Sequence, residues 1–170
     1  MVALLNGNRG STQDNDRQLA VVASGLYRVH AGPLAAGAGL SGYHQPGRLE
    51  TLDMAGARGS LNWGDLTWIG EGDLVRHRPA AGGATSGIVT SHELTWVIRQ
   101  GLELLGTYDF HDPDRHLATG ATSRWGGGVH FMPRSFLALE ALFRSTRVQP
   151  GPALQRKDYD EGVLQIHALY

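Results

Sequence analysis

Apolar and polar residues alternate along most of this chain, with the period of two that an extended strand imposes on its two faces. The pattern predicts ten strands, separated by segments rich in Gly, Pro and Asp. The predicted strands cover residues 2–7, 17–29, 34–44, 50–63, 66–77, 88–99, 102–110, 119–131, 136–146 and 159–170. Most of them have about ten residues or more, whereas strands of globular sheets have about 5–6. We therefore expect an all-β chain built from long strands.

The connections between the predicted strands alternate in length. The tight ones cover residues 30–33, 64–65, 100–101 and 132–135. The longer, polar ones cover residues 8–16, 45–49, 78–87, 111–118 and 147–158. This order is typical of an up-and-down barrel, with tight turns at one end and larger loops at the other, whereas a Greek-key sandwich has no reason to keep it. We therefore expect an up-and-down antiparallel β-barrel, to which this chain contributes about ten strands.

The two faces of the predicted strands differ in composition. In residues 102–110 one face holds Leu104 and Tyr108, whereas the other carries Glu103 and Asp109. The same division is clear in residues 17–29, 121–131 and 136–144. One face is thus apolar, with Gly and Ala near its middle, and the other carries charges inside the strand.

Alternation alone does not decide which face lines the inside of a barrel. The aromatic residues favour an outward apolar face, because they gather near strand ends, as in the girdles of membrane barrels. They are Trp63, Trp96, Phe131 and Phe136 by the tight turns, and Tyr43, Tyr108 and Phe110 by the long loops. The Gly and Ala residues at mid-strand agree, since they would fill a soluble core poorly. We therefore expect the apolar face to point outward, towards lipid, in a transmembrane barrel.

The last predicted strand ends on an aromatic residue. Leu164, Ile166, Ala168 and Tyr170 share one of its faces, and such a strand resembles the closing strand of bacterial outer-membrane β-barrels, where it serves as an assembly signal. Residues 102–114 and 131–144 also resemble the carboxy-terminal hairpins of porin-like outer-membrane proteins of Gram-negative bacteria, some of which sheathe multihaem cytochromes. The resemblance is good over residues 88–170, whereas residues 1–87 share only the general pattern of strands and turns.

The resemblance implies a location in the bacterial outer membrane, with outer-membrane lipid and the barrel assembly machinery as partners. It also implies either further strands of the same barrel or a plug protein such as a multihaem cytochrome. It brings no catalytic residue.

The composition suits a single domain over residues 1–170. Cys is absent, Gly reaches 24 residues, and 15 Lys and Arg nearly balance 16 Asp and Glu. No basic stripe suggests a nucleic acid partner, and no apolar run is long enough for a transmembrane helix. Residues 1–7 lack the basic start and apolar core of a signal peptide. Because the first strand also looks short, we expect the chain to be the carboxy-terminal section of a larger barrel.

Two groups of residues could in principle carry chemistry. Residues 111–116 combine His and Asp, which could hold a divalent cation, although Asp-Pro-Asp is equally typical of a solvated turn. His130, Ser135 and Glu140 lie close in sequence, but Ser135 falls in a tight turn and no nucleophile motif accompanies it. The sequence therefore predicts no metal ligand, cofactor or catalytic residue, and no enzyme.

The charged residues of the polar face are the candidate pore lining. They are Arg28, Arg58, Glu71, Asp73, Glu93, Arg99, Glu103, Arg124, Glu140 and Arg144. A basic residue facing lipid near the midplane costs about 2–4 kcal/mol, so these residues should face water or one another. Their mixed signs predict weak selectivity between anions and cations.

These expectations point to a porin-like channel for small polar solutes or ions, or to a passive barrel sheath. Three alternatives stay open: a small outer-membrane barrel enzyme, a structural anchor with a plugged lumen, and a soluble β-barrel or sandwich that binds a ligand.

Overall fold

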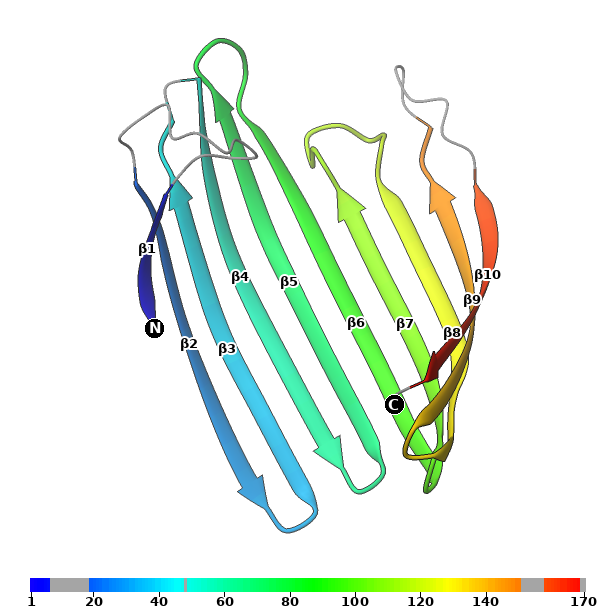
Figure 1. The fold of residues 1–170 in the computed structure, drawn as a ribbon. Helices are drawn as coiled ribbons and strands as arrows, with labels where there is room; N and C mark the ends of the chain where they lie inside the picture. Colours follow the sequence, from blue (N-terminus) through cyan, green and yellow to red (C-terminus); the bar gives the residue numbers. More distant parts are fainter. Residues whose placement is uncertain (7–18, 48, 151–157, 169–170) are drawn as a thin grey trace.

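The computed structural model describes residues 1–6, 19–47, 49–150 and 158–168, and these form ten strands (Figure 1). The strands are β1 (Val2–Asn6), β2 (Leu19–Ala31), β3 (Leu34–Gln45), β4 (Glu50–Trp63), β5 (Leu66–Pro79), β6 (Thr85–Arg99), β7 (Leu102–Asp112), β8 (Thr122–Arg134), β9 (Leu137–Val148) and β10 (Tyr159–Ala168). The described residues include no helix of the length and apolar character needed to span a membrane.

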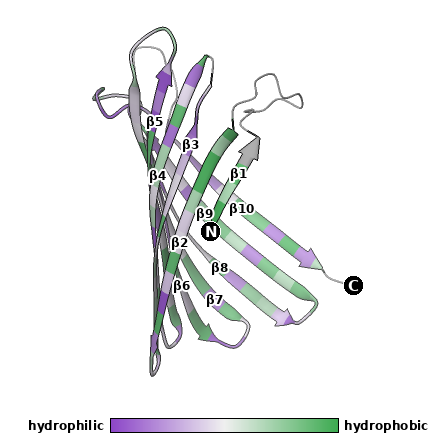
Figure 2. Cartoon of the chain, turned by 90° about the vertical axis from the view of Figure 1, so that its left-hand side faces the viewer, coloured by the Kyte–Doolittle hydropathy of each residue, from purple (hydrophilic) through white to green (hydrophobic). Residues whose placement is uncertain are grey.

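Each strand pairs with the next one along the chain, and every pairing is antiparallel. The predicted all-β, up-and-down order of ten strands is therefore confirmed. The sheet curls across its width, so that β8–β10 turn away from the plane of β2–β5 (Figures 1 and 2). Within the described residues β1 and β10 do not pair with each other, so the sheet is an open arc and the expected closure is not seen.

Two-residue turns join the tight hairpins, and glycine explains two of them. Gly32 and Gly64 stand first in their turns with φ of 60° and 57°, a conformation that is strained for residues with a side chain. Gly at the first central position is typical of the type II′ turn, whose twist matches that of the flanking strands.

The last tight turn differs from the prediction. It was expected at residues 132–135, but β8 continues to Arg134 and the turn is formed by Ser135 and Phe136. The register between β8 and β9 shifts between Phe131 and Arg134. Pro133 lies inside this shift, and because proline has no N–H for the ladder, it is tolerated at such irregularities. Other boundaries also shift by a few residues; β6, for example, begins at Thr85 rather than at residue 88.

The register assigns every paired residue to a face, because directly opposite residues of an antiparallel pair point to the same side. One side, which we call the apolar face, carries most of the large exposed hydrophobic residues. Those on β2 to β10 include Tyr27, Leu34, Leu40, Leu61, Trp63, Leu66, Trp68, Leu74, Leu94, Trp96, Leu104, Tyr108, Trp125, Val129, Phe131, Phe143, Leu164 and Ile166. The apolar face thus continues from β2 to β10.

Tyr43 does not belong to the apolar face. It lies directly opposite Val22 and Met54, on the other side of the sheet, and its hydroxyl donates a hydrogen bond to Oε1 of Gln45 at 2.7 Å. The expected aromatic girdle therefore loses Tyr43, and Phe136 lies in the tight turn itself. The other members lie on the apolar face: Trp63, Trp96, Phe131, Tyr108 and Phe110.

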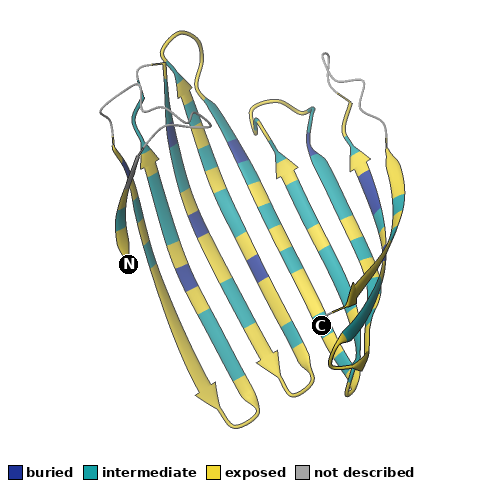
Figure 3. Cartoon of the chain, viewed as in Figure 1, coloured by how far each residue is buried: buried dark blue, intermediate teal, exposed yellow. Residues whose placement is uncertain are grey.

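The sheet has almost no buried hydrophobic core. Within the described part of the chain, the buried hydrophobic residues are only Ala20, Leu52, Ala121 and Leu142. Exposed residues recur along all the long strands (Figure 3). A soluble monomer rarely exposes apolar patches larger than a few hundred Å². We therefore expect the apolar face to be covered by another apolar surface.

Candidate functional site

The opposite side of the sheet, which we call the polar face, carries several hollows. Hollows of about 330, 250 and 350 Å³ are lined mainly by its residues. Another hollow, of about 340 Å³, lies on the apolar face beside Ala23 and Leu40. Leu52 and Leu142, two of the few buried hydrophobic residues, belong to the polar face as well.

Nine of the ten residues predicted to line a pore lie on the polar face. They are Arg28, Arg58, Glu71, Asp73, Glu93, Glu103, Arg124, Glu140 and Arg144. The tenth, Arg99, follows a register shift after Val97 that brings it opposite Leu102, a residue of the apolar-face series. One extra residue in a strand reverses the alternation beyond it. The lining of a pore by these nine residues is still a prediction.

Glycine makes room for four of these charged side chains. The residue directly opposite Arg28 is Gly37, and Gly39, Gly56 and Gly126 stand opposite Arg58, Asp73 and Arg144. A Cβ atom added to Gly39 would lie 2.9 Å from Nε of Arg58, and one added to Gly126 would lie 3.1 Å from Cγ of Arg144. The charged side chains therefore lie across glycines of neighbouring strands, a pairing that alternation alone could not reveal.

Towards the long loops, Asp109 binds both of its neighbours on the polar face. Its Oδ2 accepts hydrogen bonds from Nε and Nη2 of Arg124, at 3.0 and 2.8 Å, and its Oδ1 accepts one from the Ser91 hydroxyl at 2.8 Å. This hydrogen-bonded ion pair neutralises both charges and spans three strands, β6 to β8. Asp109 was not among the predicted pore-lining residues, although the alternation along the strand places it on the same face as Glu103.

A second group lies nearer the tight turns, around the hollow of about 350 Å³. Glu93, Glu103 and Glu140 contribute three carboxylates to it. Nδ1 of His130 lies 3.4 Å from Oε2 of Glu103, and Nη1 of Arg144 lies 3.7 Å from Oε1 of Glu161. This part of the polar face is thus rich in carboxylates, of which only some have a basic partner nearby, whereas the charges of Asp109 and Arg124 cancel.

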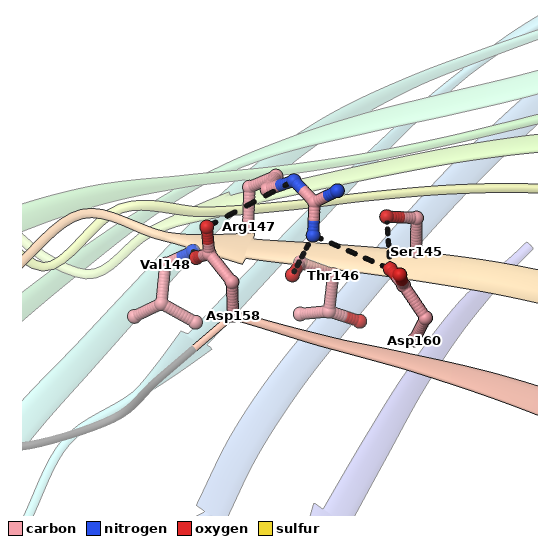
Figure 4. Close-up of polar contacts among 6 residues, drawn as sticks. All are labelled: Ser145, Thr146, Arg147, Val148, Asp158 and Asp160. Carbon is pink, nitrogen blue, oxygen red and sulfur yellow. Dashed lines mark hydrogen bonds and ion pairs between the residues drawn. The ribbon is translucent and has the colours of Figure 1, made fainter.

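A rim of charged residues bounds the apolar face at its long-loop end. Nδ1 of His44 lies 2.6 Å from Oδ1 of Asp53, and Nη2 of Arg78 lies 2.5 Å from Oδ2 of the same carboxylate. On β9 and β10, Arg147 pairs with Asp160 at 3.3 Å, and the Ser145 hydroxyl donates to Asp160 at 2.6 Å (Figure 4). The apolar face therefore has a polar border on this side.

The loop of residues 111–116, which was considered for cation binding, contains two local turns. Oδ1 of Asp112 accepts the amide of Asp114 at 3.0 Å, and Oδ1 of Asp114 accepts the amide of His116 at 3.1 Å. Such hydrogen bonds are typical of Asx turns. Among the described residues, no group of three or more His, Asp or Glu side chains is placed to bind a metal.

The residues considered for nucleophilic catalysis are only partly brought together. Glu140 stands directly opposite His130 on the polar face, but Nδ1 of His130 contacts Glu103 and Ser135 lies in the turn beyond the paired residues. Ser135 thus lies outside the paired part of the sheet to which His130 and Glu140 belong.

The terminal strand carries the expected alternation as far as it is described. Leu164, Ile166 and Ala168 lie on the apolar face, and Leu164 is 74% exposed. Tyr170, the fourth residue of the predicted assembly signal, lies outside the described residues.

Comparison of the sequence with models of known protein families and with curated proteins finds no match. Assignment to a porin-like family therefore remains a proposal, for which the strand order, the two faces and the terminal motifs are the grounds.

Proposed function

We propose that this chain forms the wall of a bacterial outer-membrane β-barrel. Its apolar face contacts lipid, and its polar face lines a passage for small polar solutes or ions, or the inside of a passive sheath. The observation that carries the proposal is the exposed apolar face, which runs from β2 to β10 with large side chains on every long strand. Burial of apolar area contributes about 25 cal/mol per Å², so a face of this extent requires a cover, and lipid is the cover we propose.

The lengths and ends of the strands support this orientation. The long strands have 10 to 15 residues, and a tilted membrane-crossing strand needs about 9–11. Trp63 and Trp96 lie near the tight turns and the His44–Asp53–Arg78 group near the long loops. Aromatic and charged residues of this kind border the apolar band of membrane barrels at its two interfaces.

The polar face suits an aqueous interior. Its charges are of both signs and several are paired, as between Arg124 and Asp109. A lining of this kind gives no strong preference for anions or cations. We therefore propose passage of small polar solutes with weak charge selectivity.

The two edges of the arc indicate how a barrel would be completed. Within the described residues, β1 pairs only with Leu19–Ala23 of β2, and the outer edge of β10 has no partner strand. In lipid every backbone N–H and C=O group must be paired, so open edges do not persist there. We propose that further strands of the same barrel, or a plug protein, pair with or cover these edges, and that the barrel assembly machinery inserts the chain.

Membrane partition tests the proposal. The folded chain should fractionate with outer membranes, require detergent for extraction, and migrate differently on mild denaturing gels before and after heating. In planar bilayers the purified protein should produce ion currents with weak charge selectivity. Recovery of the folded chain as a soluble monomer without detergent would contradict the membrane location, whereas insertion without current would leave a sheath or plugged barrel.

A further inference from the structure

One row of directly opposite residues crosses the polar face from β6 to β10. It consists of Ser91, Asp109, Arg124, Thr146 and Tyr159. All five line the hollow of about 330 Å³, which lies at the small end of the range for small-molecule sites, about 300–1,000 Å³. Neighbouring members are spaced by about 4.8 Å, the distance between paired strands, so the row presents closely spaced polar groups to one small molecule.

The charges of the row cancel. The carboxylate of Asp109 accepts two hydrogen bonds from Arg124 and one from Ser91. A guanidinium has five N–H donors, so the pair does not exhaust those of Arg124. The hollow therefore offers donors and acceptors side by side without a net charge, which suits a neutral ligand with many hydroxyl groups better than an ion.

Thr146 is the residue that indicates a missing ligand. It is 3% exposed, and among the described residues its hydroxyl has no hydrogen-bond partner. Burial of a hydroxyl without a partner is unfavourable, and such groups are rare in native proteins. Thr146 stands between Arg124 and Tyr159 in the row and lines the hollow. Its hydroxyl oxygen is closed to water, so a ligand in the hollow supplies the missing partner when the side chain turns towards it.

Tyr159 ends the row with an aromatic ring. The residue is about half exposed and belongs to the lining of the hollow. An aromatic side chain combines a flat apolar surface with a polar hydroxyl. This combination fits a sugar ring, which has apolar C–H faces and a rim of hydroxyl groups.

We propose that this hollow binds a neutral, hydroxyl-rich solute of the size of a single sugar ring. The Asp109–Arg124 pair and Thr146 bond its hydroxyl groups, and Tyr159 covers one face of the ring. The proposal rests on the proposed function only for the route by which the solute arrives, because binding itself needs no membrane.

Equilibrium dialysis of the folded chain against labelled glucose, glucuronate or glucosamine tests the charge preference. All three probes keep the sugar ring, but glucuronate has a carboxylate in place of the hydroxymethyl group and glucosamine has an ammonium group in place of one hydroxyl. Glucose should bind at least as tightly as either charged probe. Glucuronate or glucosamine binding tenfold tighter than glucose, or no glucose binding, would overturn the proposal. Failure of the proposed passage is separable, because it would appear as absent bilayer currents with intact glucose binding.

Two substitutions test the residues. Thr146→Val removes only the hydroxyl, and Arg124→Lys keeps the charge opposite Asp109 but loses the planar donors. Each should weaken glucose binding about fivefold or more, the effect of one lost hydrogen bond. Thr107→Val, on the same face but outside this hollow, should leave binding unchanged.

Stability separates a binding role from a structural one. Thr146→Val should resist urea as well as the unsubstituted chain or better, because it removes an unpartnered buried hydroxyl. Loss of stability together with binding, or unchanged glucose binding in Thr146→Val, would contradict the proposal.

Discussion

Replacement of Leu40 by Arg separates a face covered by lipid from a face covered by water. Leu40 lies near the middle of β3 on the apolar face and is 70% exposed, so the side chain makes little contact within the chain. If water covers it, the substitution should change the free energy of unfolding by no more than about 0.5 kcal/mol. If lipid covers it near the midplane, an arginine should cost about 2–4 kcal/mol.

The lipid value corresponds to a change in the folding equilibrium of roughly 30- to 700-fold. Reversible unfolding in guanidinium chloride from lipid vesicles measures it. Ser41→Arg is the matched control, because the next residue along β3 lies on the polar face opposite Gly56, where the side chain of Asp73 is close by. This control should stay within about 0.5 kcal/mol of the unsubstituted chain. Equal effects of the two substitutions in vesicles, or a Leu40→Arg effect below about 0.5 kcal/mol, would refute a lipid cover over Leu40.

Three further outcomes are expected. Gly39→Ala should lower the free energy of unfolding by about 1–3 kcal/mol, because the added Cβ would lie 2.8 Å from the Gly25 carbonyl oxygen and 2.9 Å from Nε of Arg58. Gly25→Ala is the control, since the space around its Cβ is open, and it should change resistance to urea little. Equal effects of the two substitutions would contradict the close packing around Gly39. Glu140→Gln should alter bilayer conductance or charge preference without affecting insertion; unchanged currents would remove Glu140 from the lining. Deletion of Tyr170 should slow membrane insertion without changing synthesis; a truncated chain that inserts at the normal rate would show that the terminal aromatic is not an assembly signal.

Much of the fold could be predicted because one physical constraint repeats. Alternation with a period of two fixes the two faces of each strand, and the order of short and long connections fixes the antiparallel succession. Both needed only local sequence. The same rule failed at Arg99, because a bulge changes the parity of a strand without any marker in the alternation.

The remaining errors have a similar origin. The tight turn was expected to include Met132 and Pro133, since Pro usually marks a turn. In the structure Pro133 lies instead in a register irregularity of β8, which tolerates a missing N–H equally well. Tyr43 was counted with the aromatic girdle from its position near a loop, although its face follows from its pairing with Val22.

The candidate binding row depends on register, which a single strand does not contain. Asp109, Arg124 and Thr146 lie on three strands, and only the pairing of β7, β8 and β9 brings them into one line. The pairing of strands likewise shows that glycines lie opposite Arg28 and Arg58 and leave room for their side chains. The sequence could predict that charges share a face, but their partners across the sheet required the structure.

Cysteine accessibility at adjacent residues of β7 tests the central claim most directly. The chain has no cysteine, so Glu103→Cys and Leu104→Cys each introduce a single thiol, on the polar and the apolar face respectively. In the folded protein inserted into vesicles, a water-soluble maleimide should label position 103 and not position 104. A membrane-restricted reagent should label position 104. The reverse pattern, or equal labelling of both positions by the water-soluble reagent, would contradict an apolar face in lipid around a hydrated interior.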